Sequence, residues 1–346
     1  MGPRENRPAV SAMKIGLCYD LRADYLALGW SPEDVLEFDT EETIDLLEEA
    51  VRESGHDAVR IGHAKALAAR LVAGDRWDLV FNIAEGAGGR GREAQVPALL
   101  ELYGVGYTFA DPLACAATLD KAVAKRIVRD HGLPTPGFHV VRRRADLDGL
   151  DRLALRYPLF AKPVAEGTGK GVWDTSRAET PAQLRQVCAQ LLERFRQPVL
   201  VEEFLPGREF TVAVLGNGDG ARALGTLEVV FTAGHERTAY TGENKANYEG
   251  RVDYRFPEPG PLRDKVERLA VDAYRALECR DCARADLRLD RDGEPSFLEI
   301  NPLPGLNRHH SDLPLIAREA AGLEYRDLIG AIIRHACDRL GIRHDA

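Results

Sequence analysis

The feature that most constrains the fold is a pair of apolar segments near the end of the chain. Residues 285–289 and 295–300 are strand-like, and the turn-forming residues Asp290-Arg291-Asp292-Gly293 stand between them. An acidic residue followed by glycine between two such segments predicts a β-hairpin. A hairpin fixes which residues of its two strands face each other, so it also constrains any site built on it.

Four polar side chains lie in this predicted hairpin or directly beside it, two on each strand at period-2 spacing: Arg284 and Asp286, and Glu299 and Asn301. Because side chains alternate along a strand, each strand presents its two polar residues on one face, and in a hairpin the two faces can coincide. Carboxylate and amide oxygens are the ligands that Mg²⁺ prefers, and an arginine can stabilise developing charge. We therefore predict a Mg²⁺ site that holds a triphosphate. The simpler alternative is a pair of solvated, charged strand faces.

The first third of the chain alternates short apolar segments with amphipathic ones. Residues 13–19, 58–61 and 79–82 are predicted strands, and residues 40–54 have the apolar spacing of a helix capped by Thr40. Strands that alternate with helices predict a parallel α/β sheet. Further along, we expect helices over 118–129, 181–196, 262–277 and most of 315–340, and a second hairpin arm over 209–215.

Two lysines and a glycine-rich loop are candidates for holding phosphate groups. Lys162 lies in an otherwise apolar strand, where an ammonium group is costly to bury unless it has an anionic partner. Lys121 stands at a predicted helix start. The loop after Lys162 has small residues that let backbone N–H groups approach phosphate oxygens: Glu166, Gly167, Thr168 and Gly169. Solvated lysines and a plain turn are the alternatives, and the loop lacks the Walker spacing.

The predicted strand 199–204 ends in acidic residues. Its end carries Glu202, Glu203, Phe204 and Leu205, and Glu209 follows shortly. The backbone of a strand end can bind an adenine edge, and a carboxylate can accept hydrogen bonds from ribose hydroxyls. An acidic strand terminus without a ligand is the alternative.

The order of these segments along the chain resembles that of the ATP-grasp superfamily, and within it that of the D-alanine–D-alanine ligases. The resemblance covers roughly residues 13–335. It implies an α/β architecture, in which ATP lies between two α+β lobes that follow an N-terminal, Rossmann-like parallel-sheet domain. It also implies ATP-dependent formation of an amide bond through an acyl-phosphate.

The resemblance implies a role for each matching residue. Binding of ATP falls to Lys121, Lys162, Glu166, Gly167, Thr168, Gly169, Glu202, Glu203, Phe204, Leu205, Glu209 and Lys245. Metal binding falls to Asp286, Glu299 and Asn301, normally with two Mg²⁺ ions, for which Mn²⁺ can substitute. Catalytic roles fall to Arg284, which would stabilise the tetrahedral intermediate, to Lys245, which would reach the γ-phosphate, and to Ser311, which would bind the acceptor carboxylate.

Three departures from the family pattern fall on substrate-binding elements. The family's glycine- and serine-rich signature after the first strand is missing, and Glu37 is the candidate for its glutamate. In place of the family's His-Gly segment stand Arg90 and Arg92, which either hold a second carboxylate or, as we favour here, are surface charges. The segment around Ser311 is one residue longer, and Ala246 replaces a bulky residue. We therefore expect that the chemistry is retained and that the substrates differ.

We divide the chain into a flexible N-terminal extension (1–12), an N-terminal α/β domain (13–115), a central lobe (116–201) and a C-terminal lobe with the metal and substrate site (202–346). The predicted substrates are small amino acids, or other carboxylates and amines, including those of specialised metabolism. A small-molecule kinase and a non-catalytic ATP-binding regulator are the competing hypotheses.

Composition limits the partners. The net charge of −9 argues against nucleic acid, and no apolar segment approaches the length of a membrane span. The six cysteines fit a reducing compartment, with Cys279 and Cys282 read as free thiols, so we expect a cytoplasmic protein. The family resemblance implies a homodimer.

Overall fold

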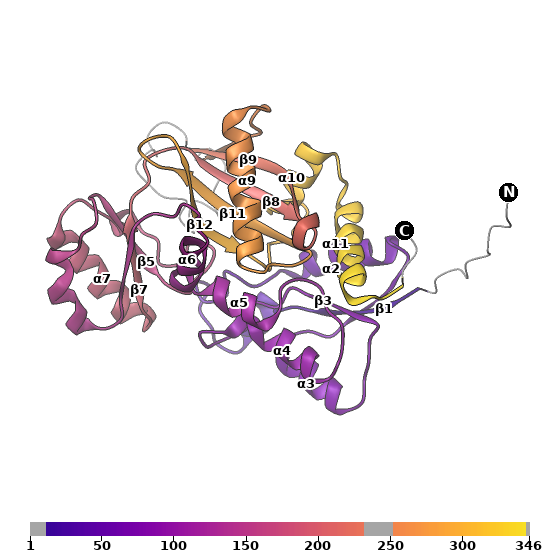
Figure 1. The fold of residues 1–346 in the computed structure, drawn as a ribbon. Coiled ribbons are helices and arrows are strands. Elements are labelled where there is room, and N and C mark those ends of the chain that lie inside the picture. Colours follow the sequence, from indigo (N-terminus) through magenta and orange to yellow (C-terminus); the bar gives the residue numbers. More distant parts are fainter. Residues whose placement is uncertain (1–11, 232–251, 344–346) are drawn as a thin grey trace.

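The computed structural model describes residues 12–231 and 252–343, and the strands in these residues form three sheets (Figure 1). The predicted N-terminal extension lies almost wholly outside the described residues. The first sheet is parallel, with strand order β2-β1-β3. Its strands are β1 (Lys14–Cys18), β2 (Asp57–Arg60) and β3 (Leu79–Asn82), and its helices are α1 (Arg22–Ala27), α2 (Glu41–Glu53), α3 (Ala64–Val72) and α4 (Gln95–Leu102). The predicted parallel α/β sheet is confirmed.

The second sheet is antiparallel, with strand order β4-β7-β5-β6. Its strands are β4 (Phe138–Val141), β5 (Leu159–Pro163), β6 (Arg177–Ala178) and β7 (Val199–Glu203), and α7 (Pro181–Phe195) packs on it. Thr180 caps α7 and Pro181 occupies its first turn, as the sequence suggests. Side chains of these strands and of α7 form a hydrophobic core of their own.

The third sheet is antiparallel and five-stranded, with order β10-β9-β8-β11-β12. Its strands are β8 (Glu209–Leu215), β9 (Arg222–Phe231), β10 (Val252–Arg255), β11 (Cys282–Leu289) and β12 (Pro295–Asn301). Side chains of β8 alternate between two cores, because Val212 and Val214 pack with α9 (Pro261–Ala276) while Ala213 and Leu215 pack with α10 (Asp312–Ala321). The two helices therefore cover opposite faces of the sheet.

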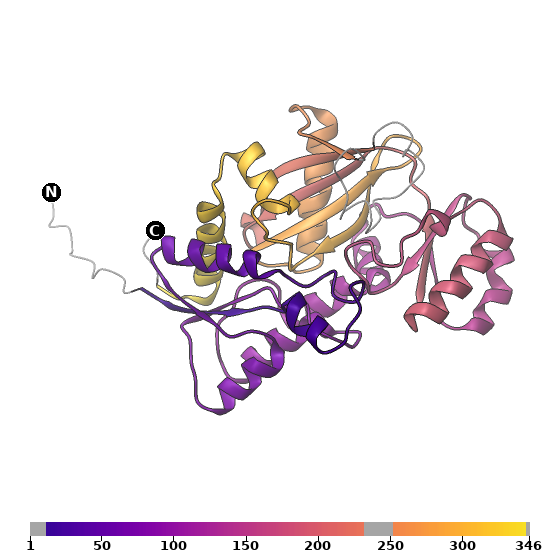
Figure 2. The ribbon, with the colours of Figure 1, turned by 180° about the vertical axis from the view of Figure 1, so that it is seen from behind.

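The core under α10 is shared with the N-terminal sheet. Ile15 of β1 and Phe81 of β3 belong to the same cluster as Leu227 of β9. The last helix, α11 (Tyr325–Leu340), contributes to this cluster and packs beside α2, as Figure 2 shows from behind. The parallel sheet and the five-stranded sheet are thus joined by one continuous hydrophobic core.

The prediction of a single helix over residues 118–129 is wrong, because the segment is divided. The chain forms two helices here, α5 (Pro112–Leu119) and α6 (Lys121–Asp130). Asp120 separates them, because its carboxylate accepts hydrogen bonds from the backbone N–H groups of Ala122 and Val123 at 3.1 and 3.0 Å. This N-cap places Lys121 in the first turn of α6.

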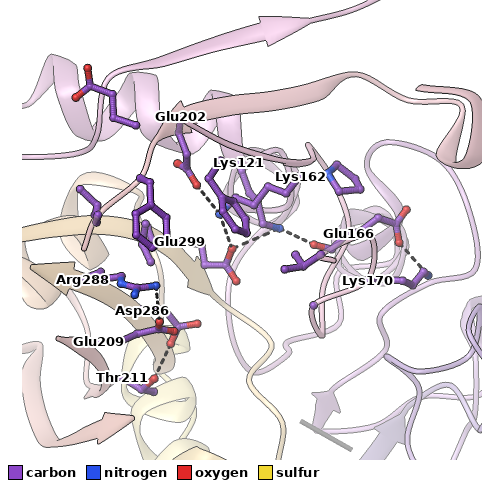
Figure 3. Close-up of a pocket in the computed structure, with 18 of the residues that line it drawn as sticks. Lys121, Lys162, Glu166, Lys170, Glu202, Glu209, Thr211, Asp286, Arg288 and Glu299 are labelled. Carbon is purple, nitrogen blue, oxygen red and sulfur yellow. Dashed lines mark hydrogen bonds and ion pairs between the residues drawn. The ribbon is translucent and has the colours of Figure 1, made fainter. Parts of the chain in front are cut away.

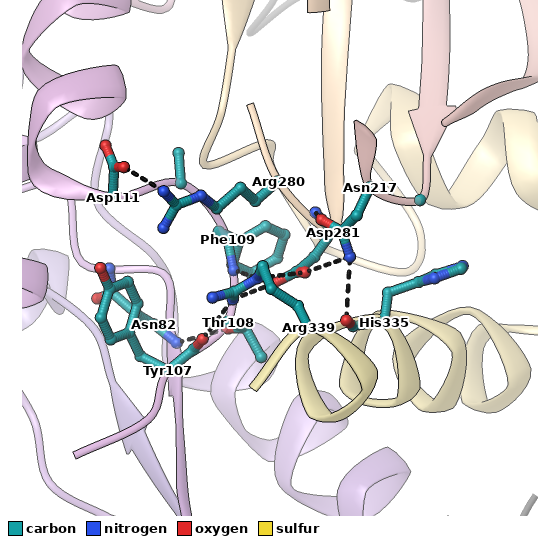
Figure 4. Close-up of polar contacts among 12 residues, drawn as sticks. Asn82, Tyr107, Thr108, Phe109, Asp111, Asn217, Arg280, Asp281, His335 and Arg339 are labelled. Atoms are coloured by element: carbon teal, nitrogen blue, oxygen red, sulfur yellow. Dashed lines mark hydrogen bonds and ion pairs between the residues drawn. The ribbon is translucent and has the colours of Figure 1, made fainter. Parts of the chain in front are cut away.

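A buried carboxylate, Asp281, links three distant segments (Figure 4). It accepts hydrogen bonds from the backbone N–H of Phe109 at 2.7 Å, from Asn217 Nδ2 at 3.1 Å and from Arg339 Nη2 at 2.9 Å. Its backbone is left-handed, with φ of 61°, a conformation that aspartate adopts more readily than most residues. The flanking thiols of Cys279 and Cys282 are free and buried, as predicted.

We expect Asp281→Asn to lower the free energy of unfolding by about 3 kcal/mol, because Arg339 loses its anionic partner while the backbone conformation is retained. Urea denaturation followed by circular dichroism measures this change. The matched control is Asp292→Asn in the exposed turn between β11 and β12, which should stay within about 0.5 kcal/mol of the parent. Equal effects of the two substitutions would contradict the assigned role.

Candidate active site

A cleft of about 110 Å³ lies between the second and third sheets (Figure 3). Its walls come from α6, β5 and β7 on one side and from β8, β11 and β12 on the other. Most of the predicted site residues line it: Lys121, Lys162, Glu166, Gly169, Glu202, Glu203, Phe204, Leu205, Glu209, Asp286 and Glu299. Segments that are far apart in the sequence therefore meet in one place.

The predicted hairpin is present, and its two polar faces coincide. In the register of β11 and β12, Asp286 pairs with Glu299, and Arg284 pairs with Asn301. Asp286 accepts a hydrogen bond from Thr211 Oγ1 at 2.9 Å, and its other oxygen lies 3.0 Å from Arg284 Nη2. The alternative of two solvated strand faces is wrong, because these side chains are mostly buried and interact with one another.

Buried ammonium groups face this hairpin across the cleft. Lys121 Nζ and Lys162 Nζ each lie 3.7 Å from the same oxygen of Glu299. Lys121 also donates to the carbonyl of Glu166 at 2.6 Å. Two cations beside a carboxylate are suited to hold a phosphate group between them.

Glu202 has a structural role that we did not predict from the sequence. Its carboxylate is 3% exposed and lies 2.9 Å from Lys162 Nζ and 2.8 Å from Lys125 Nζ. Burial alone would raise the pKa of Glu202, but the two lysines outweigh it and hold the pKa below its ordinary value. The interpretation of this position as a bare acidic strand terminus is therefore wrong.

The role of Lys125 was not predicted from the sequence. Lys125 is fully buried on α6, four residues after Lys121, and donates to the carbonyl of Phe297 at 3.1 Å as well as pairing with Glu202. Burial lowers the pKa of Lys125 to about 8, and Glu202 opposes the shift. The spacing of four residues was the available signal, because it places two lysines on one helix face.

At the other end of the cleft, Phe204 lies against two guanidinium groups. Arg177 and Arg288 stand 4.5 and 5.0 Å from the centre of its ring, and Arg288 also pairs with Glu209 at 3.2 Å. The carboxylate of Glu203 accepts a hydrogen bond from the backbone N–H of Arg156, at 2.8 Å. A flat aromatic surface beside a strand end suits a purine base.

Two side chains from the first third of the chain hold the glycine-rich loop. Glu37 accepts a hydrogen bond from the backbone N–H of Gly167 at 2.5 Å and pairs with Arg92 at 2.8 Å. Arg92 also donates to the carbonyl of Ala165 at 2.8 Å, and its side chain is 10% exposed. The interpretation of Arg92 as a surface charge is therefore wrong, whereas Arg90 is 73% exposed. Gly167 and Thr168 do not line the cleft.

The remaining predicted residues are only partly accounted for. Arg284 reaches Asp312 at 3.4 Å in addition to Asp286, and no sequence signal had indicated Asp312. Ser311 accepts a hydrogen bond from the backbone N–H of Asn307 at 3.0 Å and does not line the cleft. Lys245 and its predicted loop lie outside the described residues.

The donor set fits Mg²⁺ bound together with a substrate phosphate. Asp286 and Glu299 offer carboxylate oxygens on paired strand positions, with the amide of Asn301 beside them. The described part of the chain has no group of three or more histidine, cysteine, aspartate and glutamate side chains able to hold a metal ion. Mg²⁺ in phosphate sites is commonly held by one or two carboxylates and by the phosphates themselves. When bound, the metal would neutralise negative charge on the triphosphate.

Comparison with known proteins gives consistent results. Residues 127–334 match the family model described as the D-ala D-ala ligase C-terminus. Over 296 residues, 82% of the chain, it is 37% identical to an uncharacterised protein of Sinorhizobium fredii, with 84% of that protein covered. Over 291 residues, 83% of the chain, it is 36% identical to the D-alanine–D-alanine ligase of Bordetella petrii, of which 84% is covered.

A solved structure has the same fold. The D-alanine–D-alanine ligase of Bacillus anthracis, complexed with ATP, matches with a TM-score of 0.72 at 24% identity, over 95% of this chain and 98% of that one. The cleft between the two antiparallel sheets and these matches define an ATP-grasp enzyme. Within that class, the chain belongs to the D-alanine–D-alanine ligase family. The predictions of fold class, family and an ATP-dependent, C–N bond-forming ligase are confirmed.

We expect Lys125→Met to weaken ADP binding about tenfold and to lower the free energy of unfolding by about 3 kcal/mol. The substitution leaves Glu202 with Lys162 alone, which would draw Lys162 away from the cleft. Calorimetry measures the binding and urea denaturation the stability. Lys265→Met is the control, since Lys265 pairs with Glu294 on the surface and should contribute little. Unchanged ADP affinity in Lys125→Met would contradict this role.

Asp39 predicts a pH dependence of stability. Burial raises its pKa from 3.8 to about 7, aided by Asp20 and opposed by Arg22. The folded state therefore binds this proton more tightly than the unfolded state. Protonated Asp39 therefore stabilises the folded state fully below about pH 4, and this stabilisation is lost as the pH rises through about 7.

In Asp39→Asn this loss should be absent. The free energy of unfolding of the variant, minus that of the parent, should grow by up to about 4 kcal/mol between pH 4 and pH 8. Urea titrations at several pH values measure the difference. A difference that does not depend on pH would show that Asp39 titrates in its ordinary range.

Proposed function

We propose that this protein joins a carboxylate to an amine through an acyl-phosphate, with ATP converted to ADP and phosphate. The observation that carries this proposal is the alignment of Asp286 with Glu299 and of Arg284 with Asn301, across the cleft from buried lysines. Such an arrangement supplies a metal-binding edge and a cation next to it. A protein that only binds ATP has no need of both.

Each group of residues in the cleft would bind one part of ATP or its metal ion. Phe204, Leu205 and the backbone of Glu203 would form the adenine site, with Glu209 at the ribose. The triphosphate would lie against Lys121 and Lys162, with Glu166, Gly167, Thr168 and Gly169 beside it, and Lys245 would complete the phosphate contacts. Asp286, Glu299 and Asn301 would hold Mg²⁺, with which the family uses ATP. Glu202 would act through Lys162, which it orients.

The proposed chemistry has two steps. First, a carboxylate oxygen attacks the γ-phosphorus of ATP, the bond to the bridging oxygen breaks, and ADP leaves. Then the nitrogen of an amine attacks the acyl carbon and loses a proton to solvent, while inorganic phosphate leaves and an amide remains. Arg284 would stabilise the oxyanion of this second step, because its guanidinium is held beside the hairpin by Asp286 and Asp312. The chain contributes orientation and charge neutralisation rather than a covalent nucleophile.

The substrates are proposed to be amino acids or related carboxylates and amines. The relative from Bordetella petrii is named for D-alanine as both donor and acceptor. The segments that carry Glu37 and Arg92 depart from the family pattern, which supports a donor other than D-alanine. The role of Ser311 at the acceptor carboxylate also remains a proposal, since its hydroxyl is turned to Asn307.

Domain organisation, assembly and location complete the proposal. Residues 13–115, 116–201 and 202–346 would be its three domains, and family resemblance supports a homodimer in the cytoplasm. In the described residues, no helix has the length and apolar character needed to cross a membrane.

The test is ADP release with Mg²⁺ across D- and L-amino acids, singly and in pairs, with mass spectrometry of the products. We expect one amide product for each ADP. A phosphorylated substrate without an amide would identify a kinase and contradict the proposal.

In the same assay, we expect Arg284→Met to lower kcat by about 10²- to 10³-fold, the usual loss when one stabilising group of an oxyanion is removed. The affinity for ATP should stay within threefold. Arg318→Met is the matched control, since among the described residues Arg318 pairs only with its exposed neighbour Glu319, and the substitution should leave both quantities unchanged.

A further inference from the structure

A second, larger cavity of about 490 Å³ lies on the far side of the glycine-rich loop. Residues 30–38 and 86–92 of the N-terminal domain line one side of it, and residues 195–198 and 164–170 of the central lobe line the other. A volume of this size falls within the range typical of small-molecule sites, about 300–1,000 Å³. The side chain of alanine is a single methyl group and would fill only a small part of this cavity.

This cavity adjoins the nucleotide cleft. Glu166 and Lys170 line both spaces, and they pair with each other at 2.8 Å. Asp120 lines the second cavity, while the next residue, Lys121, lines the cleft and donates to the carbonyl of Glu166. The two spaces therefore share part of their lining, next to the glycine-rich loop. A molecule in the second cavity would therefore lie next to the proposed phosphate end.

The wall formed by the N-terminal domain is aromatic and well packed. Trp30 and Phe38 line the cavity, and both contact Tyr25, Trp30 edge-to-face and Phe38 at a tilt, with ring centres 5.0 and 4.4 Å from that of Tyr25. Phe195 faces them from the central lobe. Trp30 and Phe38 belong to the segment in which this chain departs from the family's glycine- and serine-rich signature.

Charged side chains that line the cavity form three ion pairs. Arg92 pairs with Glu37, Lys170 with Glu166, and Arg90 with Asp120. Burial would raise the pKa of Glu37, but Arg92 and then Lys170 outweigh it, and the pKa lies below its ordinary value. Glu37 is thus a carboxylate already neutralised by Arg92. Of the other charged residues that line the cavity, Asp34 and Arg196 are exposed. The interior therefore offers apolar surface and no net charge.

We propose that this cavity holds the side chain of the carboxylate donor, and that the donor is an α-amino acid with an aromatic or branched aliphatic side chain rather than alanine. The inference rests on the proposed ligase function and specifies its substrate. Burial of an apolar side chain between Trp30, Phe38 and Phe195 would supply the selectivity. The reacting carboxylate would lie at the boundary formed by Glu166 and Lys170, next to the cleft.

Gly88 is a position at which bulk can be added to the cavity wall. It lies on the cavity wall, has no positive φ, and a Cβ placed on it meets no atom within 4 Å. Gly149 has the same freedom but lies in a 3₁₀ helix outside both cavities. Gly88→Phe and Gly149→Phe are therefore a matched pair that adds the same bulk at the site and away from it.

The experiment measures kcat/KM for dipeptide formation with alanine, leucine and phenylalanine as donors, in both configurations, at saturating acceptor. We expect the best large donor to exceed alanine at least tenfold. Gly88→Phe should lower kcat/KM for that donor at least tenfold and should change kcat/KM for alanine less than twofold. Gly149→Phe should leave kcat/KM for both donors unchanged.

A preference for alanine, or equal losses with all donors in Gly88→Phe, would overturn the inference while leaving the ligase function intact. Failure of every donor to release ADP would instead overturn the proposed function, and the inference with it.

Discussion

The arrangement of the active site depends on one buried carboxylate placed between two buried ammonium groups. Glu202 on β7 pairs with Lys162 on β5 and with Lys125 on α6. Lys125 in turn donates to the carbonyl of Phe297 on β12, so the same network reaches the five-stranded sheet. Charged groups are costly to bury singly, and each member is tolerated in the interior because the others are present.

This network explains why buried lysines line one wall of the cleft. Glu202 uses both of its oxygens on lysines and leaves Lys162 close enough to Glu299 to share it with Lys121. Across the cleft, the register of β11 and β12 sets Asp286 opposite Glu299. The ion network therefore fixes the lysines on one side of the cleft, and the strand register fixes the carboxylates on the other side. A polyphosphate with its metal ion has the charge pattern that fits between them.

Much of the fold and of the cleft could be predicted, because the relevant signals are local in the sequence. Alternation along strands and an Asp-Gly turn were enough to place four polar side chains on one face. Lys125 and Asp312 escaped prediction because their partners lie far away in the sequence. Arg92 was misread because its neighbours in sequence are glycine and charged residues, whereas its partners, Glu37 and Ala165, come from other elements. The break between α5 and α6 was missed because Asp120 stands within a continuous amphipathic pattern and acts through its own cap.

The separate core of the central sheet has a mechanical consequence. The parallel sheet and the five-stranded sheet share one core and are fastened again by Asp281, so relative displacement of these two would expose apolar surface and break a buried ion pair. The central sheet keeps its own core, and its links to the rest run mainly through α6 and polar contacts such as that of Glu37 with Gly167. A displacement of the central sheet as a unit would therefore leave both cores intact. Because this sheet and its loops line both cavities, one such displacement would change the widths of both cavities together.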